Sequence, residues 1–121
     1  MKENIIQTKS FEFAIRIINA VKHLQNDKRE FILSKQIMRS GTSVGANIEE
    51  AIGGQSTKDF IAKLSISYKE ARETLYWLKL LKATDYLRQD EANSLIEDAN
   101  ELCKILSSIL ISTKQRINNK D

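Results

Sequence analysis

Apolar residues recur at steps of three and four along almost the whole chain, a spacing typical of amphipathic α-helices. Short polar or glycine-containing segments divide this pattern into four stretches. We therefore expect one all-α domain over residues 1–121, with helices at about 9–25, 30–52, 57–83 and 89–116. The absence of proline and a hydrophobic content of 41% agree with a helical chain that buries a core.

The apolar residues of the first stretch cover far more of the helix surface than one core-facing stripe would. We expect one side to face the protein's own core and another side to face a neighbouring copy, because large exposed apolar surfaces usually mark contacts. Trp77 lies among aliphatic residues, which favours a buried or intersubunit anchor over a platform that stacks on nucleotides. The candidate contacts between copies are Phe11, Phe13, Ile17, Leu24, Ile66 and Trp77.

Two glycines, Gly41 and Gly45, lie one turn apart within the second stretch, although each costs a helix interior roughly 1 kcal/mol relative to alanine. Together with Ser34 they form a nearly smooth strip, which would let another helix approach closely. The alternative is a bend or a break between two short helices. The apolar spacing continues through both glycines and favours a single helix.

Several residues indicate where the helices begin and end. Thr8 or Ser10 is suited to cap the start of the first helix. Gly53 or Gly54 would end the second helix in the left-handed conformation, and Ser56 begins a variant of the capping box ahead of the third. The last stretch holds a heptad seam, which predicts near-parallel packing against a neighbouring helix.

Polar residues gather in the second stretch around Asn47, which lies just off the apolar face. Ser40, Ser43 and Glu50 lie within one or two turns of it. Buried polar side chains need hydrogen-bond partners, so this set predicts a polar network that specifies how the helices pack. A binding site is the alternative interpretation.

The run Ser43-Val-Gly-Ala-Asn-Ile-Glu-Glu-Ala51, followed by Ser56-Thr-Lys-Asp-Phe-Ile61 and Glu73-Thr-Leu75, resembles the 23S rRNA intervening-sequence protein family, also called four-helix-bundle proteins. The likeness extends from about Phe11 to Ile111. It implies an up-and-down antiparallel four-helix bundle that assembles into a ring-like homo-oligomer, typically a pentamer.

The resemblance also bears on single residues. Glu73 falls on the family's glutamate in the third helix and so joins the candidate polar network. Ala51 replaces the family's usual glycine, and Glu70 stands where many relatives have a small residue. A more distant likeness is to the accessory protein of diversity-generating retroelements, a pentameric barrel that binds nucleic acid and a reverse transcriptase.

The charge balance permits an anionic partner without requiring one, since 19 basic residues stand against 16 acidic residues and give a net charge of +3. A ring of identical copies would repeat any basic surface and strengthen its field. We expect RNA to be the favoured ligand, and DNA or a protein partner remains open. The candidate nucleic-acid contacts are Arg16, Lys22, Lys28, Arg29, Lys35, Arg39, Lys114 and Arg116.

The residues that usually carry catalysis are scarce. Cys103 is the single cysteine, which is expected to be a small core residue, and His23 is the single histidine. We therefore expect no metal or other cofactor and no enzymatic activity. No apolar run is long enough to span a membrane and the N-terminus does not look like a signal peptide, so a cytoplasmic location is expected.

Two other functions compete with a nucleic-acid-binding scaffold. A protein-protein adaptor is supported by the surplus apolar surface of the first helix. A ribonuclease is the other, because Arg16 and His23 share a helix face at a spacing similar to that of the HEPN ribonucleases. That spacing is short and is met easily by chance, and no partner acid or second histidine accompanies it.

Overall fold

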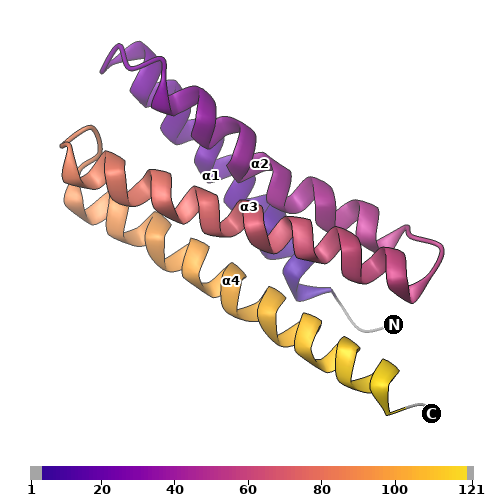
Figure 1. Cartoon of the computed structure of the whole chain (residues 1–121). Helices are drawn as coiled ribbons and strands as arrows, with labels where there is room; N and C mark the ends of the chain where they lie inside the picture. Colours follow the sequence, from indigo (N-terminus) through magenta and orange to yellow (C-terminus); the bar gives the residue numbers. More distant parts are fainter. Residues whose placement is uncertain (1–3, 120–121) are drawn as a thin grey trace.

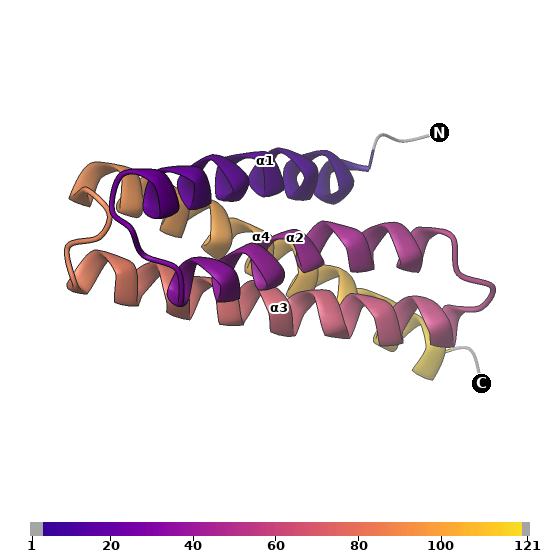
Figure 2. The same ribbon diagram turned by 90° about the horizontal axis from the view of Figure 1, so that it is seen from above.

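The computed structural model describes residues 4–119, which form four α-helices joined by short loops (Figure 1). The helices are α1 (Ile5–Asn26), α2 (Leu33–Ile52), α3 (Thr57–Ala83) and α4 (Gln89–Asn118). Each runs antiparallel to the one before it, and contacts join α1 to α2, α2 to α3, α3 to α4 and α4 to α1 (Figure 2). Over residues 4–119 there is no strand, and α1 does not contact α3, nor α2 contact α4. The fold is an up-and-down four-helix bundle.

The core forms where the apolar stripes of the helices meet. Phe13 and Ile17 of α1, Ile48 of α2 and Leu106 of α4 are all buried there. Each such side chain contributes about 1.5–3 kcal/mol relative to an exposed one. Cys103 is buried on α4 as predicted, and its burial raises the pKa of the thiol.

Helix α1 begins at Ile5, earlier than the sequence predicts. The side-chain oxygen of Asn4 accepts a hydrogen bond from the backbone N–H of Gln7 at 3.2 Å and so caps the helix. The prediction that Thr8 or Ser10 caps it is wrong, because both residues lie inside the first turns. The hydroxyl of Ser10 donates instead to the carbonyl of Gln7 at 3.1 Å.

Helix α2 begins at Leu33, whereas the sequence predicts a start near Glu30. Glu30 lies in the loop, and its carboxylate accepts hydrogen bonds from the backbone N–H groups of Ile32 (3.1 Å), Leu33 (2.9 Å) and Ser34 (2.7 Å). The first N–H groups of a helix have no partner within it, and a negative charge is favourable there. Glu30 therefore caps α2 from outside the helix.

The predicted left-handed end of α2 is also wrong. Gly53 has a φ of −83°, and no glycine of the described chain has a positive φ. The left-handed conformation occurs instead at two loop residues that are not glycine, Arg29 (φ 55°) and Asp85 (φ 65°). The turn after Gly54 therefore needs none of the conformational freedom that glycine provides.

The predicted start of α3 is confirmed. The hydroxyl of Ser56 accepts a hydrogen bond from the backbone N–H of Asp59 at 3.1 Å. Asp59 lies in the first turn, where a carboxylate is favourable.

Helix α2 continues through both glycines, which confirms a single helix, and α1 packs closely against them. A Cβ atom built at Gly41 would lie 2.9 Å from side-chain carbons of Ile17, which is fully buried. A Cβ atom at Gly45 would lie 3.3 Å from the hydroxyl of Ser10. The glycines thus allow α1 and α2 to approach more closely than larger residues would permit.

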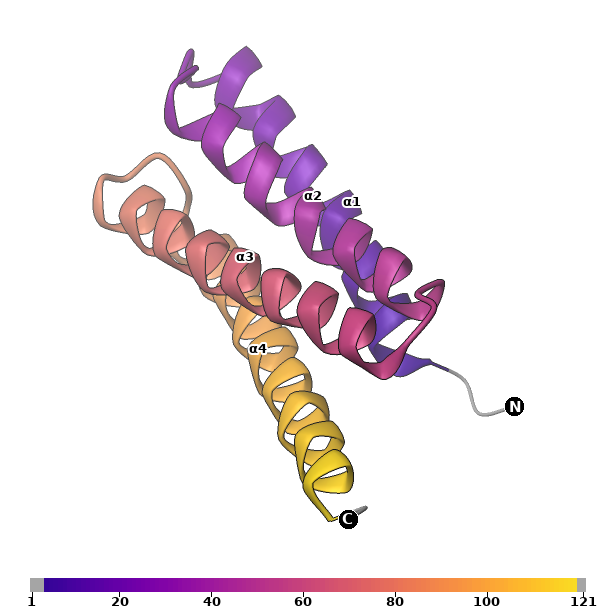
Figure 3. The same cartoon turned by 45° about the vertical axis from the view of Figure 1, so that its right-hand side comes forward.

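Helix α1 packs less closely against α4 than against α2. Helix α4 diverges from α1 toward its C-terminal end in the view from above (Figure 2), and in the same direction it separates from α3 (Figure 3). Ion pairs bridge the surface between them, from Arg16 to Asp98 at 2.6 Å and from Lys9 to Glu101 at 3.3 Å.

We predict that Gly41→Ala lowers the free energy of unfolding by about 1–2 kcal/mol, because strain against Ile17 exceeds the gain in helix propensity. Urea denaturation followed by circular dichroism measures this change. Gly53→Ala is the matched control, because its Cβ would lie no closer than 3.7 Å to its neighbours. Equal stabilities of the two variants would contradict the close packing at Gly41.

Candidate nucleic-acid interface

Exposed basic residues collect at the end of the bundle where α1 ends and α2 begins. Because the helices alternate in direction, the C-terminal turns of α3 and the start of α4 lie at this same end (Figures 1 and 2). We call this the loop end. Four of the predicted nucleic-acid contacts lie there and are exposed, namely Lys22, Lys28, Arg29 and Lys35.

Two further lysines of the loop end were missed from the sequence. Lys79 and Lys82 line a hollow of about 490 Å³ together with Gln89 and Asn93, between the end of α3 and the start of α4. The signal that could have found them is topological, because an up-and-down bundle places the last turns of the third helix beside the first turns of the second.

The remaining predicted contacts lie elsewhere. Arg16 forms its ion pair with Asp98 midway along the bundle, and Arg39 is engaged by two acids of α3. Lys114 and Arg116 lie near the C-terminal end of α4, at the opposite end from the loop end. Within residues 4–119, the predicted set therefore divides into a cluster that forms no ion pair, two arginines paired with acids, and a separate pair at the other end.

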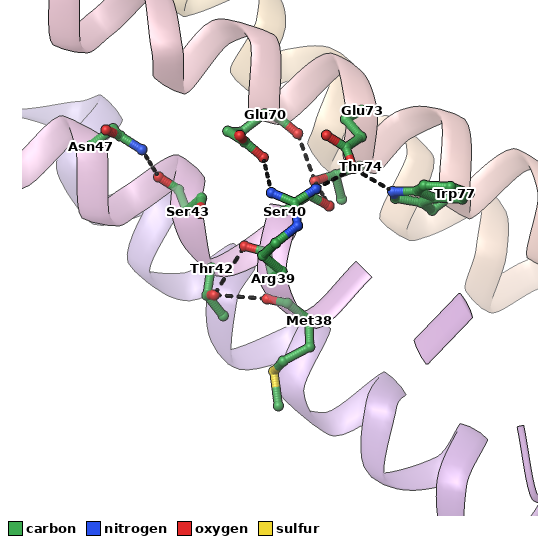
Figure 4. A network of polar contacts seen from close by, with 10 residues as sticks. All are labelled: Met38, Arg39, Ser40, Thr42, Ser43, Asn47, Glu70, Glu73, Thr74 and Trp77. Atoms are coloured by element: carbon green, nitrogen blue, oxygen red, sulfur yellow. Dashed lines mark hydrogen bonds and ion pairs between the residues drawn. The ribbon is translucent and has the colours of Figure 1, made fainter. Parts of the chain in front are cut away.

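Arg39 forms a polar network on the surface between α2 and α3 (Figure 4). Its guanidinium donates to the carboxylate of Glu70 at 3.0 Å and also to that of Glu73. Glu73 accepts a third hydrogen bond, from the indole N–H of Trp77 at 2.9 Å. The roles of Arg39 and Glu70 in this network were not predicted from the sequence, although Glu70, Glu73 and Trp77 lie at steps of three and four on one helix.

The network shifts the acidity of its members. The hydrogen bond from Trp77, followed by that from Arg39, holds the pKa of Glu73 below its ordinary value and outweighs the opposing effect of partial burial. The bond to Glu73 is also the main cause that raises the pKa of Arg39. The charge of Arg39 is therefore balanced by Glu70 and Glu73, which makes Arg39 a poor contact for an anionic ligand.

The predicted contacts between copies separate into two groups. Phe13, Ile17 and Leu24 are buried in the protein's own core, so their assignment to an intersubunit surface is wrong. Phe11 (68% exposed) and Ile66 (40% exposed) do reach the surface. Trp77 is partly buried and is tied to Glu73.

The candidate ribonuclease residues do not converge on one site. The guanidinium of Arg16 is directed to Asp98 of α4, whereas Nδ1 of His23 lies 2.8 Å from the carboxylate of Asp27 at the end of α1. Between residues 4 and 119 there is no group of acidic, histidine and cysteine side chains that could hold a metal ion. In the same part of the chain, no helix is long and apolar enough to cross a membrane.

Comparison with known proteins settles the relationship. A profile of the 23S rRNA-intervening sequence protein family matches residues 2–108. The chain belongs to this family. It is 52% identical to a protein of unknown function from the S23 ribosomal protein family of Bacteroides thetaiotaomicron, whose crystal structure has a TM-score of 0.87 to this chain. That likeness covers 88% of this chain and 98% of the other, and no curated protein was found to match.

Polar residues of the motif in α2 that resembles this family make contacts within α2 and with α3. The side-chain amide of Asn47 donates to the carbonyl of Ser43 at 2.8 Å on its own helix. Glu50 pairs with Lys63 of α3 at 2.7 Å.

Ser40 lies one turn before the motif on α2 and is fully buried. Its hydroxyl accepts a hydrogen bond from the hydroxyl of Thr74 at 2.8 Å. The predicted set Ser40, Ser43, Asn47, Glu50 and Glu73 is thus divided among separate contacts and does not form one network.

We predict that Glu73→Gln destabilises this family member at pH 7 by no more than about 1 kcal/mol, because the pair with Arg39 is partly solvated. The pKa of Glu73 is lower in the folded state than its ordinary value of 4.5. Its charge therefore stabilises the fold above that pH, and the contribution disappears as the pH falls through the folded-state pKa. Urea titrations of both proteins across this pH range, followed by Trp77 fluorescence, should show the difference closing in acid.

Glu50→Gln provides the control, because the pair of Glu50 with Lys63 involves no indole and is more exposed. A constant difference between the wild type and Glu73→Gln at every pH would show that the charge of Glu73 does not matter.

Proposed function

We propose that this protein is a non-enzymatic, self-associating four-helix-bundle scaffold that binds nucleic acid, with RNA as the favoured ligand. The observation that carries the proposal is the cluster of Lys22, Lys28, Arg29 and Lys35 at the loop end. Over residues 4–119, no ion pair connects these four side chains to an acid. Unpaired cations on one surface are what a phosphate backbone requires, because binding releases its condensed counterions.

The family supports RNA only indirectly. Its name refers to sequences that interrupt 23S rRNA, and the protein from Bacteroides thetaiotaomicron is described as having unknown function. The net charge of +3 would be repeated by each copy in a homo-oligomer, for which the family resemblance suggests a pentamer. Self-association would thus convert a small basic cluster into an extended surface.

The surface of α1 supports self-association. Phe11 (68% exposed) and Ile15 (46% exposed) lie about one turn apart on the solvent side of the helix. Phe11 lines a hollow of about 230 Å³ together with the small residues Ala14, Gly45 and Ala46. An apolar side chain next to a small-residue hollow is the kind of surface that a second copy can cover.

We predict that labelled structured RNA binds the purified protein with an affinity that falls log-linearly as salt rises and persists near physiological salt. Fluorescence anisotropy titrations at several salt concentrations measure both quantities, and duplex DNA serves as the comparison ligand. The double variant Lys28→Glu with Lys35→Glu should bind more weakly and reduce the salt slope by about two.

The matched control is Lys58→Glu with Lys69→Glu, which makes the same change in net charge at exposed sites on α3 away from the loop end. Equal weakening by the two double variants would contradict the loop end as the binding surface. No binding of either nucleic acid at low salt would favour the protein-protein adaptor.

We predict that Phe11→Ser shifts the protein toward single chains in light scattering at micromolar concentration, because it removes the most exposed apolar side chain of α1. Ile111→Ser, at a residue 55% exposed on α4, is the control and should leave the assembly intact. A wild-type protein with the mass of one chain would contradict self-association altogether.

A further inference from the structure

The loop between α1 and α2 has an exposed face that is basic and aromatic, although its sequence, Asp27-Lys-Arg-Glu-Phe-Ile32, includes two acids. Glu30 is only 8% exposed because its carboxylate is turned toward the start of α2. Asp27 is paired with His23 on the preceding turn. Within residues 4–119, neither acid forms an ion pair with Lys28 or Arg29.

The outward face of the loop is formed by Lys28, Arg29, Phe31 and Ile32, which are all exposed. The guanidinium carbon of Arg29 lies 5.1 Å from the centroid of the Phe31 ring, which is a cation-π contact. Phe31 remains 41% exposed. The loop thus presents the contact between Arg29 and Phe31 to solvent, with Lys28 next to Arg29 in the chain and Lys35 in the first turn of α2.

The backbone holds this arrangement in place. Arg29 adopts a φ of 55°, which non-glycine residues rarely do. The backbone N–H of the next residue, Glu30, donates to the carbonyl of Leu24 at 2.9 Å and ties the loop to the end of α1. Because unusual backbone conformations persist only where the surroundings impose them, the fold fixes the backbone from which the side chains of Arg29 and Phe31 project.

The chemistry of this face matches unpaired nucleotides. Bases that are not in a duplex stack on aromatic rings and on guanidinium planes, while lysines contact the flanking phosphates. A paired duplex hides its base faces and offers only its backbone to such a loop. A lipid surface fits less well, because the ring of Phe31 lies against the guanidinium of Arg29 and only Ile32 projects freely beside it.

We propose that the α1–α2 loop binds an unpaired segment of nucleic acid, with a base stacked on the Phe31–Arg29 pair and adjacent phosphates held by Lys28 and Lys35. This inference rests on the proposed function and names the form of nucleic acid that the loop end selects. Binding through the lysines alone would not distinguish paired from unpaired strands, whereas stacking on Phe31 does.

The test compares a single-stranded RNA with an RNA duplex of the same length, each fluorescently labelled, in anisotropy titrations at one fixed salt concentration. Phe31→Leu removes the aromatic face and keeps an apolar side chain, so the loop retains its packing. It should raise the Kd for the single strand roughly 5- to 100-fold, the effect of losing one stacked base. The Kd for the duplex should change less than about twofold, because phosphate contacts remain.

Ile32→Ala is the matched control, since it removes a neighbouring apolar side chain that is 77% exposed, and it should leave both Kd values unchanged. Circular dichroism of each variant checks that the helices are retained. Equal effects of Phe31→Leu on both probes, or no effect on either, would overturn the stacking role while leaving nucleic-acid binding intact.

Two other outcomes are decisive. If the wild type binds neither RNA at low salt, the proposed function fails together with this inference. If Phe31→Leu and Ile32→Ala instead both abolish binding to vesicles containing phosphatidylserine, while RNA binding is unchanged, the loop contacts a membrane surface and the inference is wrong.

Discussion

The close contact between α1 and α2 at Ile17 and Gly41 is the constraint on which the rest of the structure depends. The absence of a side chain at Gly41 lets the buried face of α1 sit directly on α2. Ile17 is held on α2 by this contact, and the other buried residues of α1 lie on the same side of the helix. The exposed positions of Phe11 and Ile15 follow from it, because a helix that packs deeply on one side must present its opposite side to solvent.

The same helix pair determines where positive charge is available. Arg16 and Arg39 lie along the bundle, where acids of neighbouring helices pair with them. At the loop end, Glu30 is committed to the backbone of α2, and no ion pair between residues 4 and 119 joins Lys22, Lys28 or Lys35 to an acid. The buried carboxylate that caps α2 thus forms no ion pair, within residues 4–119, with the cations of the proposed nucleic-acid surface.

Self-association and ligand binding would reinforce each other in this arrangement. The apolar strip with Phe11 faces sideways from α1, whereas the basic loop lies at the end of the same helix. Copies that meet through their sides would leave their loop ends free and repeated. Weak single contacts with phosphate then add across copies, because later contacts form within an existing complex.

The sequence by itself determined the number of helices, their approximate extents and the family, because apolar spacing and cap residues act within a few turns of the chain. The cap at Ser56 and the unbroken helix through Gly41 are local properties of this kind. Only the tertiary structure decided which apolar residues of α1 face inward, since Phe13 and Phe11 are equally hydrophobic and only packing against α2 separates them. The tertiary structure also decided which arginines pair with an acid. Arg16 and Arg39 pair with Asp98 and Glu73, which are far away along the chain. Only the fold brings these acids within hydrogen-bond reach.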